Sequence, residues 1–347
     1  MESYIFEGGR PPERIFGRVY SYPFICRTGA EIEPCALPFV SARGIKAFRC
    51  APVFADVSCA LPAERAYVLP FTGKNVTVAV IDTGISPHLD FMLMRNRIVA
   101  FRDFINGYET PYDDNGHGTA VCGIIAGNGA MSCGTVRAAA YKAGLAVIKA
   151  VDAKGEGNAL NILEGMQWIF SNRKKYNIRV VNMSFGALPS GENDPLMLGA
   201  EALWKSGITV VASAGNLGPK GGTVLSPAAS PDVIAVGGSK GDNVAEFSSR
   251  GPAANCNKPD MLAPAENVLS ASSERYGCNS GTSMSAPQIA ALAALVYEVA
   301  PDVVPDKVKE IIVNSCERVA GCGANVCGAG IISAELFRQN IYESFGV

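Results

Sequence analysis

The chain has 347 residues, 48% of them hydrophobic and 18% charged, so it can bury a large core in one or two domains. Its net charge of −2 gives no reason to expect a nucleic-acid or anionic-membrane partner. It contains no run of 18 apolar residues, so no membrane span is expected.

The cysteines and the first residues bear on the compartment. The chain has 11 cysteines, with no CxxC pair and no short spacing to a histidine, so metal and redox motifs are weakly supported. Residues 1–14 lack the basic region and apolar core of a secretory signal. Many thiols without such a signal favour a reducing compartment, and we therefore expect a cytoplasmic protein.

Residues 1–66 differ in pattern from the rest of the chain. Two strand-like runs, Arg18–Cys26 and Ala47–Val57, flank a middle segment at Glu31–Ala42. This pattern predicts a small α+β unit, with Pro62–Gly73 as the connection to the larger remainder of the chain. The alternative is an N-terminal extension without a role of its own.

From Lys74 onward, apolar strand patterns alternate with helical ones. Val76–Ile81 is a β-branched run without polar alternation, which is typical of a strand covered on both faces. Similar runs lie at Leu145–Val151, Arg179–Phe185, Ile208–Ala214 and Val233–Gly237, and helical patterns at His117–Ala126, Asn158–Arg173, Pro195–Ser206, Ser283–Val299, Pro305–Cys316 and Ser333–Tyr342. The alternation predicts an α/β fold for residues 67–347, a three-layer, doubly wound and mostly parallel sheet.

Ligands of such sheets bind outside the carboxyl ends of the strands. Three predicted strands end in polar residues or glycine, at Asp82-Thr83-Gly84, Ser184-Phe185-Gly186 and Ser213-Ala214-Gly215-Asn216. Loops of this composition often carry functional sites. These three strand ends are therefore where a site is expected.

Three side chains have the chemistry of nucleophilic catalysis. Ser283 opens an apolar helix after Gly281, where free backbone N–H groups favour a negative charge. His117, one of two histidines, lies between two glycines at the start of another helix, and Asp82 ends a buried strand. An aspartate that orients a histidine, which in turn deprotonates a serine, is the usual arrangement for acyl transfer. Asn216 offers an amide donor suited to an oxyanion.

Each of these residues also has an ordinary structural explanation. Ser283 can be part of a capped core helix, Asp82 a turn residue, His117 a structural histidine and Asn216 a left-handed turn residue. Four such coincidences at the mouth of one predicted sheet are much less common than any one of them. The combination therefore favours a site.

The order of the motifs resembles the subtilisin-like serine peptidases, the subtilases of peptidase family S8. The similarity rests on DTG at Asp82, HGT at His117, SAGN ending at Asn216 and GTSMSAP around Ser283, and it extends over roughly three quarters of the chain, Lys74 to Gly330. It implies a serine endopeptidase, a hydrolase of peptide bonds working through an acyl-enzyme. In that family Ser283 would be the nucleophile, His117 the base, and Asp82 its orienting partner. Asn216 and the Ser283 N–H would hold the oxyanion.

The resemblance also implies how an extended peptide or protein substrate binds. Two edge segments, Gly155-Glu156-Gly157 and Ser184-Phe185-Gly186, would clamp the substrate backbone. The substrate would also contact Ser213, Ala214 and Gly215. Part of the pocket next to the cleaved bond would be lined by Leu217 and Leu225. Their apolar character suggests a preference for apolar residues over charged ones.

Residues 1–66 match, in size and position, the propeptide of the family, which assists folding and blocks the cleft until it is removed. The chain would then be a self-processing zymogen with its own prodomain as a partner. A maturation cut between Ala51 and Ala66 would suit this arrangement.

Some residues depart from the family pattern. Ala120 stands where a second histidine is common, and Cys122 stands where a small residue is usual, as a buried and inert thiol by our interpretation. No cofactor is required for the chemistry. Asp90 matches a family Ca²⁺ ligand, so a structural Ca²⁺ is an open alternative, although the loop at residues 127–133 supplies few oxygens for such a site. His88 is similar to a non-catalytic family histidine and is assigned a structural role.

Two other functions remain as alternatives. One is a catalytically silent, subtilase-like regulator or binding protein, although such proteins usually lack a triad residue. The other is an esterase or lipase, which would carry GxSxG at a strand-to-helix turn with the histidine last in the chain. Here the corresponding segment is Gly281-Thr-Ser-Met-Ser285, and His117 precedes the serine.

Overall fold

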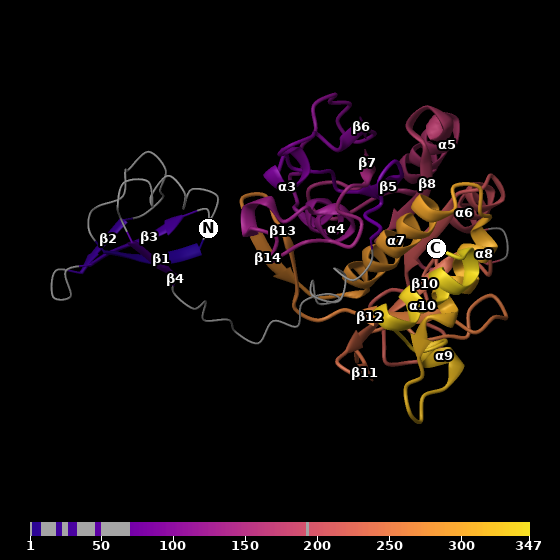
Figure 1. Cartoon of the computed structure of the whole chain (residues 1–347). Helices are drawn as coiled ribbons and strands as arrows, with labels where there is room; N and C mark the ends of the chain where they lie inside the picture. Colours follow the sequence, from indigo (N-terminus) through magenta and orange to yellow (C-terminus); the bar gives the residue numbers. More distant parts are fainter. Residues whose placement is uncertain (1, 8–18, 23–26, 33–45, 50–69, 192–193) are drawn as a thin grey trace. The chain divides into compact units, whose positions relative to one another are not determined.

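The computed structural model describes residues 2–7, 19–22, 27–32, 46–49, 70–191 and 194–347 (Figure 1). The chain divides into two compact units. One contains residues 1–57 and 129–136, and the other contains residues 58–128 and 137–347. The predicted boundary at residue 66 and the predicted cut between residues 51 and 66 lie outside the described residues, so both stay predictions.

The described residues of the N-terminal segment form four strands. They are β1 (Glu2–Glu7), β2 (Val19–Tyr22), β3 (Arg27–Ile32) and β4 (Lys46–Arg49). The strands make an antiparallel sheet in the order β2-β3-β1-β4. The predicted middle segment at residues 31–42 lies almost entirely outside the described residues.

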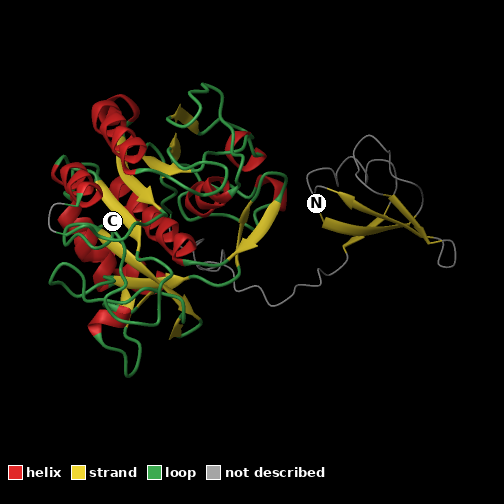
Figure 2. Ribbon diagram, turned by 180° about the vertical axis from the view of Figure 1, so that it is seen from behind, coloured by secondary structure: helices red, strands yellow, loops and turns green. Residues whose placement is uncertain are grey.

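A ten-stranded, mostly parallel sheet forms the second unit (Figures 1 and 2). Its order is β15-β16-β12-β10-β9-β8-β5-β7-β6, with the short β11 paired to β10. The strands are β5 (Thr77–Asp82), β6 (Ile98–Asp103), β7 (Gly144–Lys149), β8 (Ile178–Met183), β9 (Thr209–Ser213), β10 (Ile234–Lys240), β11 (Asn243–Val244), β12 (Met261–Pro264), β15 (Cys316–Glu317) and β16 (Ile331–Ile332). Only β11 and β15 run antiparallel to their neighbours within the described sheet.

The order of the strands reverses at β5. This strand pairs with β7 on one side and with β8 on the other, both in parallel. Its six residues are all buried, because helices cover both faces of the sheet there. The carboxyl end of β5, where Asp82 lies, is therefore at the switch point at which α/β sheets form ligand sites.

Helices cover the sheet on two sides. The helices α4 (His117–Ala126) and α7 (Thr282–Val299) pack against each other and against the sheet, whereas α5 (Ala159–Tyr176) and α6 (Pro195–Lys205) pack as a second pair over β5 to β9. The remaining described helices are α3 (Leu89–Met92), α8 (Pro305–Asn314), α9 (Ala324–Cys327) and α10 (Ala334–Phe345), together with a 3₁₀ turn at Ala130–Ser132. The predicted three-layer α/β architecture is confirmed.

The helix α7 is buried on almost every side. Its alanines let it approach both α4 and the sheet closely, as small residues do in packed interfaces. Its N-cap, Gly281, has φ 140°, a conformation that L side chains rarely adopt, and this glycine allows the sharp turn before Ser283.

A two-stranded ribbon, β13 (Val268–Ala271) with β14 (Tyr276–Asn279), leads into α7 and packs on α4. The sequence patterns did not predict this ribbon.

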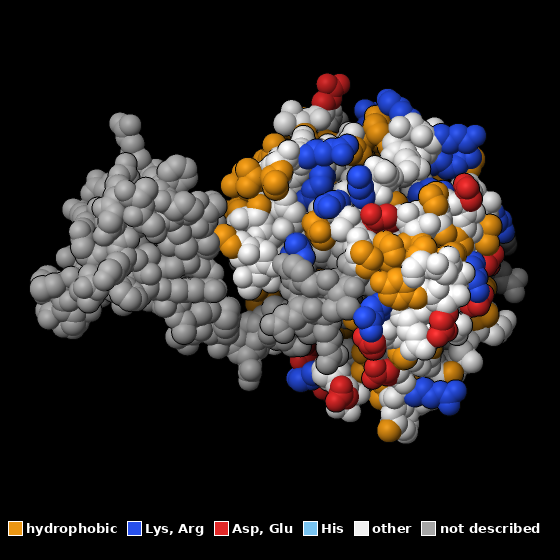
Figure 3. Space-filling view, viewed as in Figure 1, with side chains coloured by type: hydrophobic (Ala, Val, Ile, Leu, Met, Phe, Trp, Pro, Cys, Tyr) orange, Lys and Arg blue, Asp and Glu red, His pale blue; other side chains and the backbone are white. Residues whose placement is uncertain are grey.

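The face of the molecule visible in Figure 3 carries charged side chains of both signs. Within the described part of the chain, no helix combines the length and apolar character needed to cross a membrane.

Candidate active site

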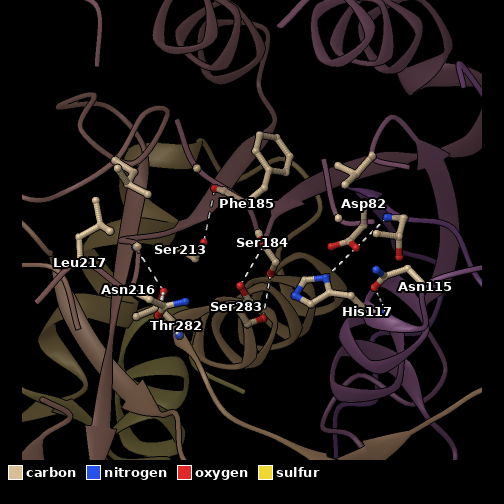
Figure 4. Close-up of a pocket in the computed structure, with 16 residues that line it drawn as sticks. Asp82, Asn115, His117, Ser184, Phe185, Ser213, Asn216, Leu217, Thr282 and Ser283 are labelled. Atoms are coloured by element: carbon tan, nitrogen blue, oxygen red, sulfur yellow. Dashed lines mark hydrogen bonds and ion pairs between the residues drawn. The ribbon is translucent and has the colours of Figure 1, made fainter. Parts of the chain in front are cut away.

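Asp82 is the last residue of β5, and its side chain is 2% exposed. Its Oδ1 accepts a hydrogen bond from the backbone N–H of Thr83 at 2.7 Å and lies 2.7 Å from Nδ1 of His117. Because a carboxylate can only accept, the proton between Asp82 and His117 sits on Nδ1. In the neutral imidazole the other ring nitrogen is then unprotonated, and it faces Ser283 (Figure 4).

His117 is the first residue of α4, and 32% of its side chain is exposed. The helix begins directly against the turn after β5. A Cβ at Gly118 would lie 2.2 Å from the carbonyl oxygen of Gly84, so only glycine permits this approach. The glycine after the histidine thus brings His117 within reach of Asp82.

The carboxylate of Asp113 organises the start of α4. Its Oδ1 accepts from the N–H of Gly116 at 2.8 Å and from the hydroxyl of Thr83 at 2.9 Å. Its Oδ2 accepts from the N–H and the hydroxyl of Thr119, at 2.8 and 2.6 Å. Burial alone would raise the pKa of Asp113, but these hydrogen bonds outweigh it and lower the pKa below 3.8.

Lys149 supports the same turn from the neighbouring strand. It ends β7 directly opposite Asp82, and its side chain is fully buried. Its Nζ donates to the carbonyl of Thr83 at 2.7 Å and to the carboxylate of Asp114 at 2.7 Å. Lys149 and Asp113 therefore hold the turn after Asp82 from two sides.

The environment of His117 raises its pKa. Burial alone lowers the pKa, but the charge of Asp82, the hydrogen bond to Asp82 and the charge of Asp113 together raise it above 6.5. The imidazolium is thus stabilised by the carboxylates. A histidine with this property can take a proton from a nucleophile and later return it.

Ser283 lies in the first turn of α7 and lines the same cavity as His117. Its Oγ donates to the carbonyl of Ser184 at 3.0 Å, and the hydroxyl of Ser184 donates to the carbonyl of Ser283 at 2.9 Å. Asn182 donates in turn to the Ser184 hydroxyl at 2.9 Å. These bonds attach the start of α7 to the end of β8 and point the serine hydroxyl at Ser184 rather than at His117.

Asn216 follows β9, and its side-chain carbonyl is fully engaged. The Oδ1 accepts from the N–H of Thr282 at 2.9 Å and from its hydroxyl at 3.0 Å. The hydroxyl of Thr282 in turn accepts from the N–H of Gly215 at 3.2 Å. The amide nitrogen of Asn216 is thereby presented at the cavity, next to Ser283 (Figure 4).

The cavity that joins these groups has a volume of about 370 Å³. It is lined by eight of the residues predicted to bind substrate: Gly155, Ser184, Phe185, Gly186, Ser213, Gly215, Leu217 and Leu225. Three others that were predicted do not line it. Ala214 is fully buried behind it, and Glu156 and Gly157 are exposed beyond its rim, where Gly157 pairs with Val151.

Sequence reasoning missed several residues that build the site. Asn115, Val151 and Thr282 line the cavity, and Asp113 and Lys149 act from behind it. Two of these had a signal in the sequence. Asp113 precedes a glycine and a helix start, as capping aspartates do, and Lys149 is a charged residue inside an apolar strand run.

The surroundings of Asp90 do not fit a Ca²⁺ site. Its carboxylate accepts from the hydroxyl of Tyr276 at 2.8 Å, and its backbone carbonyl accepts from Arg97. The Arg97 guanidinium, which is 6% exposed, also donates to the carbonyl of Ala126. A cation of the protein itself therefore binds the carbonyl oxygens of Asp90 and Ala126. Among the described residues, no group of three or more acidic, histidine or cysteine side chains is arranged to hold a metal.

His88 and Cys122 both lie away from the cavity. His88 is 4% exposed, and its Nε2 is 2.7 Å from the carbonyl oxygen of Arg275. Cys122 is fully buried in α4, and burial, with the charges of Asp82 and Asp113, raises its thiol pKa well above 9.0. Both environments agree with the structural roles expected for these residues.

Comparison with known proteins agrees with this geometry. The model of the subtilase family matches residues 73–345. The chain is 39% identical over 299 residues to serine protease AprX of Bacillus subtilis (strain 168), which covers 76% of this chain and 66% of AprX. It is 34% identical to the minor extracellular protease Epr of the same strain, over 69% of this chain and 34% of Epr.

Two further similarities cover most of the matched protein. Subtilisin DY of Bacillus licheniformis is 33% identical over 285 residues, or 80% of this chain and 96% of subtilisin DY. The crystal structure of a cold adapted subtilisin-like serine proteinase aligns with a TM-score of 0.64 at 27% identity, over 74% of this chain and 88% of that one. The chain thus spans just under two thirds of AprX and a third of Epr, but nearly all of subtilisin DY. On the family match, the identities and the fold, this chain belongs to the subtilase family.

Proposed function

We propose that this protein is a serine endopeptidase that cleaves peptide bonds through an acyl-enzyme. The observation that carries the proposal is the 2.7 Å contact between Asp82 and His117, in a cavity that also holds Ser283 and the amide of Asn216. The relative that is 39% identical is named serine protease AprX, and the similar solved structure is that of a subtilisin-like serine proteinase. The residues therefore take the roles of orienting carboxylate, base, nucleophile and oxyanion donor.

The reaction begins when Ser283 turns its hydroxyl from the Ser184 carbonyl toward the free nitrogen of His117. His117 takes the proton as Oγ attacks the substrate carbonyl, and the positive imidazolium is stabilised by Asp82. The oxyanion accepts from the Asn216 amide and from the N–H of Ser283, which lies in the first turn of α7. His117 then gives its proton to the leaving amine. Water next attacks the acyl carbonyl while His117 takes its proton, and His117 returns that proton to Ser283 Oγ as the acid product leaves.

The substrate is an extended peptide or protein chain. The segment Ser184–Gly186 forms one wall of the cavity and continues the parallel strand β8, so a peptide can pair along it as an added strand. We also propose that the N-terminal unit, with its antiparallel sheet, is a prodomain that the enzyme removes. The chemistry requires no cofactor. The cytoplasmic location stays a prediction of the sequence.

A fluorophosphonate probe tests the proposal, because such probes label only a serine that an adjacent base has activated. The native chain should incorporate the probe at Ser283 and hydrolyse a casein substrate. Ser283→Ala should lose both properties, keep its far-ultraviolet circular dichroism, and accumulate with the N-terminal segment uncut. The matched control is Ser280→Ala, an exposed serine outside the cavity, which should be labelled and active.

The alternatives give different results in the same experiment. A catalytically silent, subtilase-like binding protein would remain unlabelled although it is folded. An esterase would be labelled and would hydrolyse small esters, but it would leave peptides intact. Either result would contradict the proposal.

A further inference from the structure

Leu225 occupies the floor of the cavity between its two glycine walls. A Cβ placed on Gly186 would lie 2.7 Å from both Cβ and Cδ1 of Leu225. A Cβ placed on Gly215, on the opposite wall, would lie 2.7 Å from Cγ and 2.8 Å from Cδ1 of the same side chain. The leucine therefore packs on the bare backbone of both walls and fills the slot between them.

The backbone around Leu225 is fixed by hydrogen bonds to both walls. Its N–H donates to the carbonyl of Ala214 at 2.9 Å. The next residue, Ser226, pairs with Ala187 in both directions, at 2.8 and 3.0 Å. Both neighbouring segments therefore hold the backbone of Leu225 at the slot.

A buried carboxylate fastens the same loop from behind. The hydroxyl of Ser226 donates to Oδ1 of Asp194 at 2.6 Å. Asp194, which is 3% exposed, also caps α6 by accepting from the N–H groups of Leu196 and Met197. The floor of the slot is therefore tied to the start of a helix. A bulky ligand would have to displace a side chain whose backbone is held on both sides.

The slot lies where the side chain next to the cleaved bond must go. The attacked carbonyl carbon contacts Ser283 Oγ while its oxygen points at the Asn216 amide. The residue that carries this carbonyl, called here the acyl-side residue, runs along the Ser184–Gly186 wall. Its side chain then points between that wall and Ser213–Gly215, toward Leu225. Within the described lining, the charged or ionisable side chains Asp82 and His117 lie at the opposite end of the cavity from Leu217 (Figure 4).

We propose that Leu225 restricts the enzyme to small apolar acyl-side residues such as alanine, and excludes aromatic ones. This inference rests on the proposed endopeptidase function and specifies its substrate class. The two glycine walls would by themselves accept a flat, large side chain. Leu225 makes the slot between the walls too shallow for such a side chain. Among the described residues that line this slot, none is charged, and this disfavours lysine, arginine and glutamate as the acyl-side residue.

Peptide p-nitroanilides that differ only in the acyl-side residue test the inference. The substrates are succinyl-Ala-Ala-Pro-X with alanine, leucine, phenylalanine or lysine as X, and enzyme concentrations are set by fluorophosphonate titration. The native enzyme should show kcat/KM for alanine at least about tenfold above that for phenylalanine. Leu225→Ala should raise the phenylalanine-to-alanine ratio at least about tenfold, because it reopens the slot. Leu225→Val should give a smaller change in the same direction.

The control variant is Leu198→Ala. Leu198 lies on α6, is 48% exposed and is not part of the cavity, so the ratio should stay that of the native enzyme. If the native enzyme is labelled and active but prefers phenylalanine, the inference is wrong while the endopeptidase function stands. The inference is also wrong, and the endopeptidase function still stands, if Leu225→Ala is labelled by the fluorophosphonate but has the native phenylalanine-to-alanine ratio of kcat/KM. If the native enzyme is neither labelled nor active on any substrate, the proposed function fails and the inference fails with it. The native profile remains decisive even if Leu225→Ala does not fold.

Discussion

The Oδ1 atom of Asp82 lies 2.7 Å from the Nδ1 atom of His117, although the two residues are 35 positions apart in the chain. The contact joins the end of a buried strand to the first residue of a helix. It fixes the histidine tautomer, because the carboxylate accepts the Nδ1 proton and leaves the other nitrogen able to take one. Several measurable properties depend on this contact.

The pH dependence of activity reports the state of His117. The pKa of His117 is raised above 6.5, chiefly by the charge and hydrogen bond of Asp82 acting against burial. Since the base must be neutral, kcat/KM should rise with pH through a midpoint above 6.5. The imidazolium, for the same reason, should stabilise the fold most at pH below 6.5, and this contribution should disappear as pH rises through the folded pKa. A midpoint below 6.5 would contradict the role of Asp82.

Replacement of Asn216 tests the oxyanion site. Asn216→Ala removes the amide that Thr282 orients, and kcat should fall by about 10²–10³ while KM changes much less. Steady-state kinetics on one p-nitroanilide give both constants. The control is Asn243→Ala, at an exposed position of β11 outside the cavity, which should have native kcat. A native kcat for Asn216→Ala would show that other groups hold the oxyanion.

Replacement of Asp113 tests the support of the His117 helix. Asp113→Asn places an NH₂ group against donors from Thr119 and Gly116, so the free energy of unfolding should fall by about 1–3 kcal/mol. The kcat should also fall, because the start of α4 positions His117. The pKa of Asp113 is lowered below 3.8, so its stabilising effect is present above that pH and is lost as pH falls through the folded pKa.

Urea unfolding and steady-state kinetics measure the two effects of Asp113→Asn. Asp302→Asn, at an exposed position, serves as the control and should change neither quantity. Native stability of Asp113→Asn would mean that the hydrogen bonds of Asp113 are replaced by other donors and acceptors at no cost.

We propose that the buried guanidinium of Arg97 stabilises the surroundings of Asp90 in place of a Ca²⁺ ion. Burial lowers the pKa of Arg97 to about 10, against the opposing charge of Asp90, so the group stays charged at neutral pH. We expect a chelator to leave the thermal unfolding midpoint unchanged. Arg97→Met should lower stability by about 2–4 kcal/mol, because buried carbonyl groups lose their donor. Arg95→Met, at an exposed position, should be neutral. A midpoint that drops in the chelator would show a structural metal and overturn this expectation.

The sequence predicted the fold class and the elements that carry the site. The helix at His117–Ala126 was predicted with the bounds that the structure shows, because glycine and a histidine precede an apolar run. The buried strands before Asp82, Ser184 and Asn216 were predicted to within one or two residues. Apolar runs of this length report burial on both faces, which is a local property of the sequence.

Other strands carry too little local signal. The edge strand Ile98–Asp103 is half-exposed, and the Val268–Asn279 ribbon is formed by two runs of four residues. Such segments become strands because a partner is present, and the partner is distant in the chain or depends on a turn. Their pattern alone resembles that of a loop.

The sequence by itself determined the candidate site residues, because the chemistry of each is visible in its own motif. They are Asp82, His117, Ser283 and Asn216. The sequence could not show that Leu225 fills the slot between Gly186 and Gly215, or that Lys149 and Asp113 hold the turn after Asp82. Lys149 and Thr83, for example, are 66 positions apart. Such contacts form only once the parallel strands have aligned their carboxyl ends. Packing and hydrogen bonding depend on the distance between residues in space, and only the completed fold determines that distance.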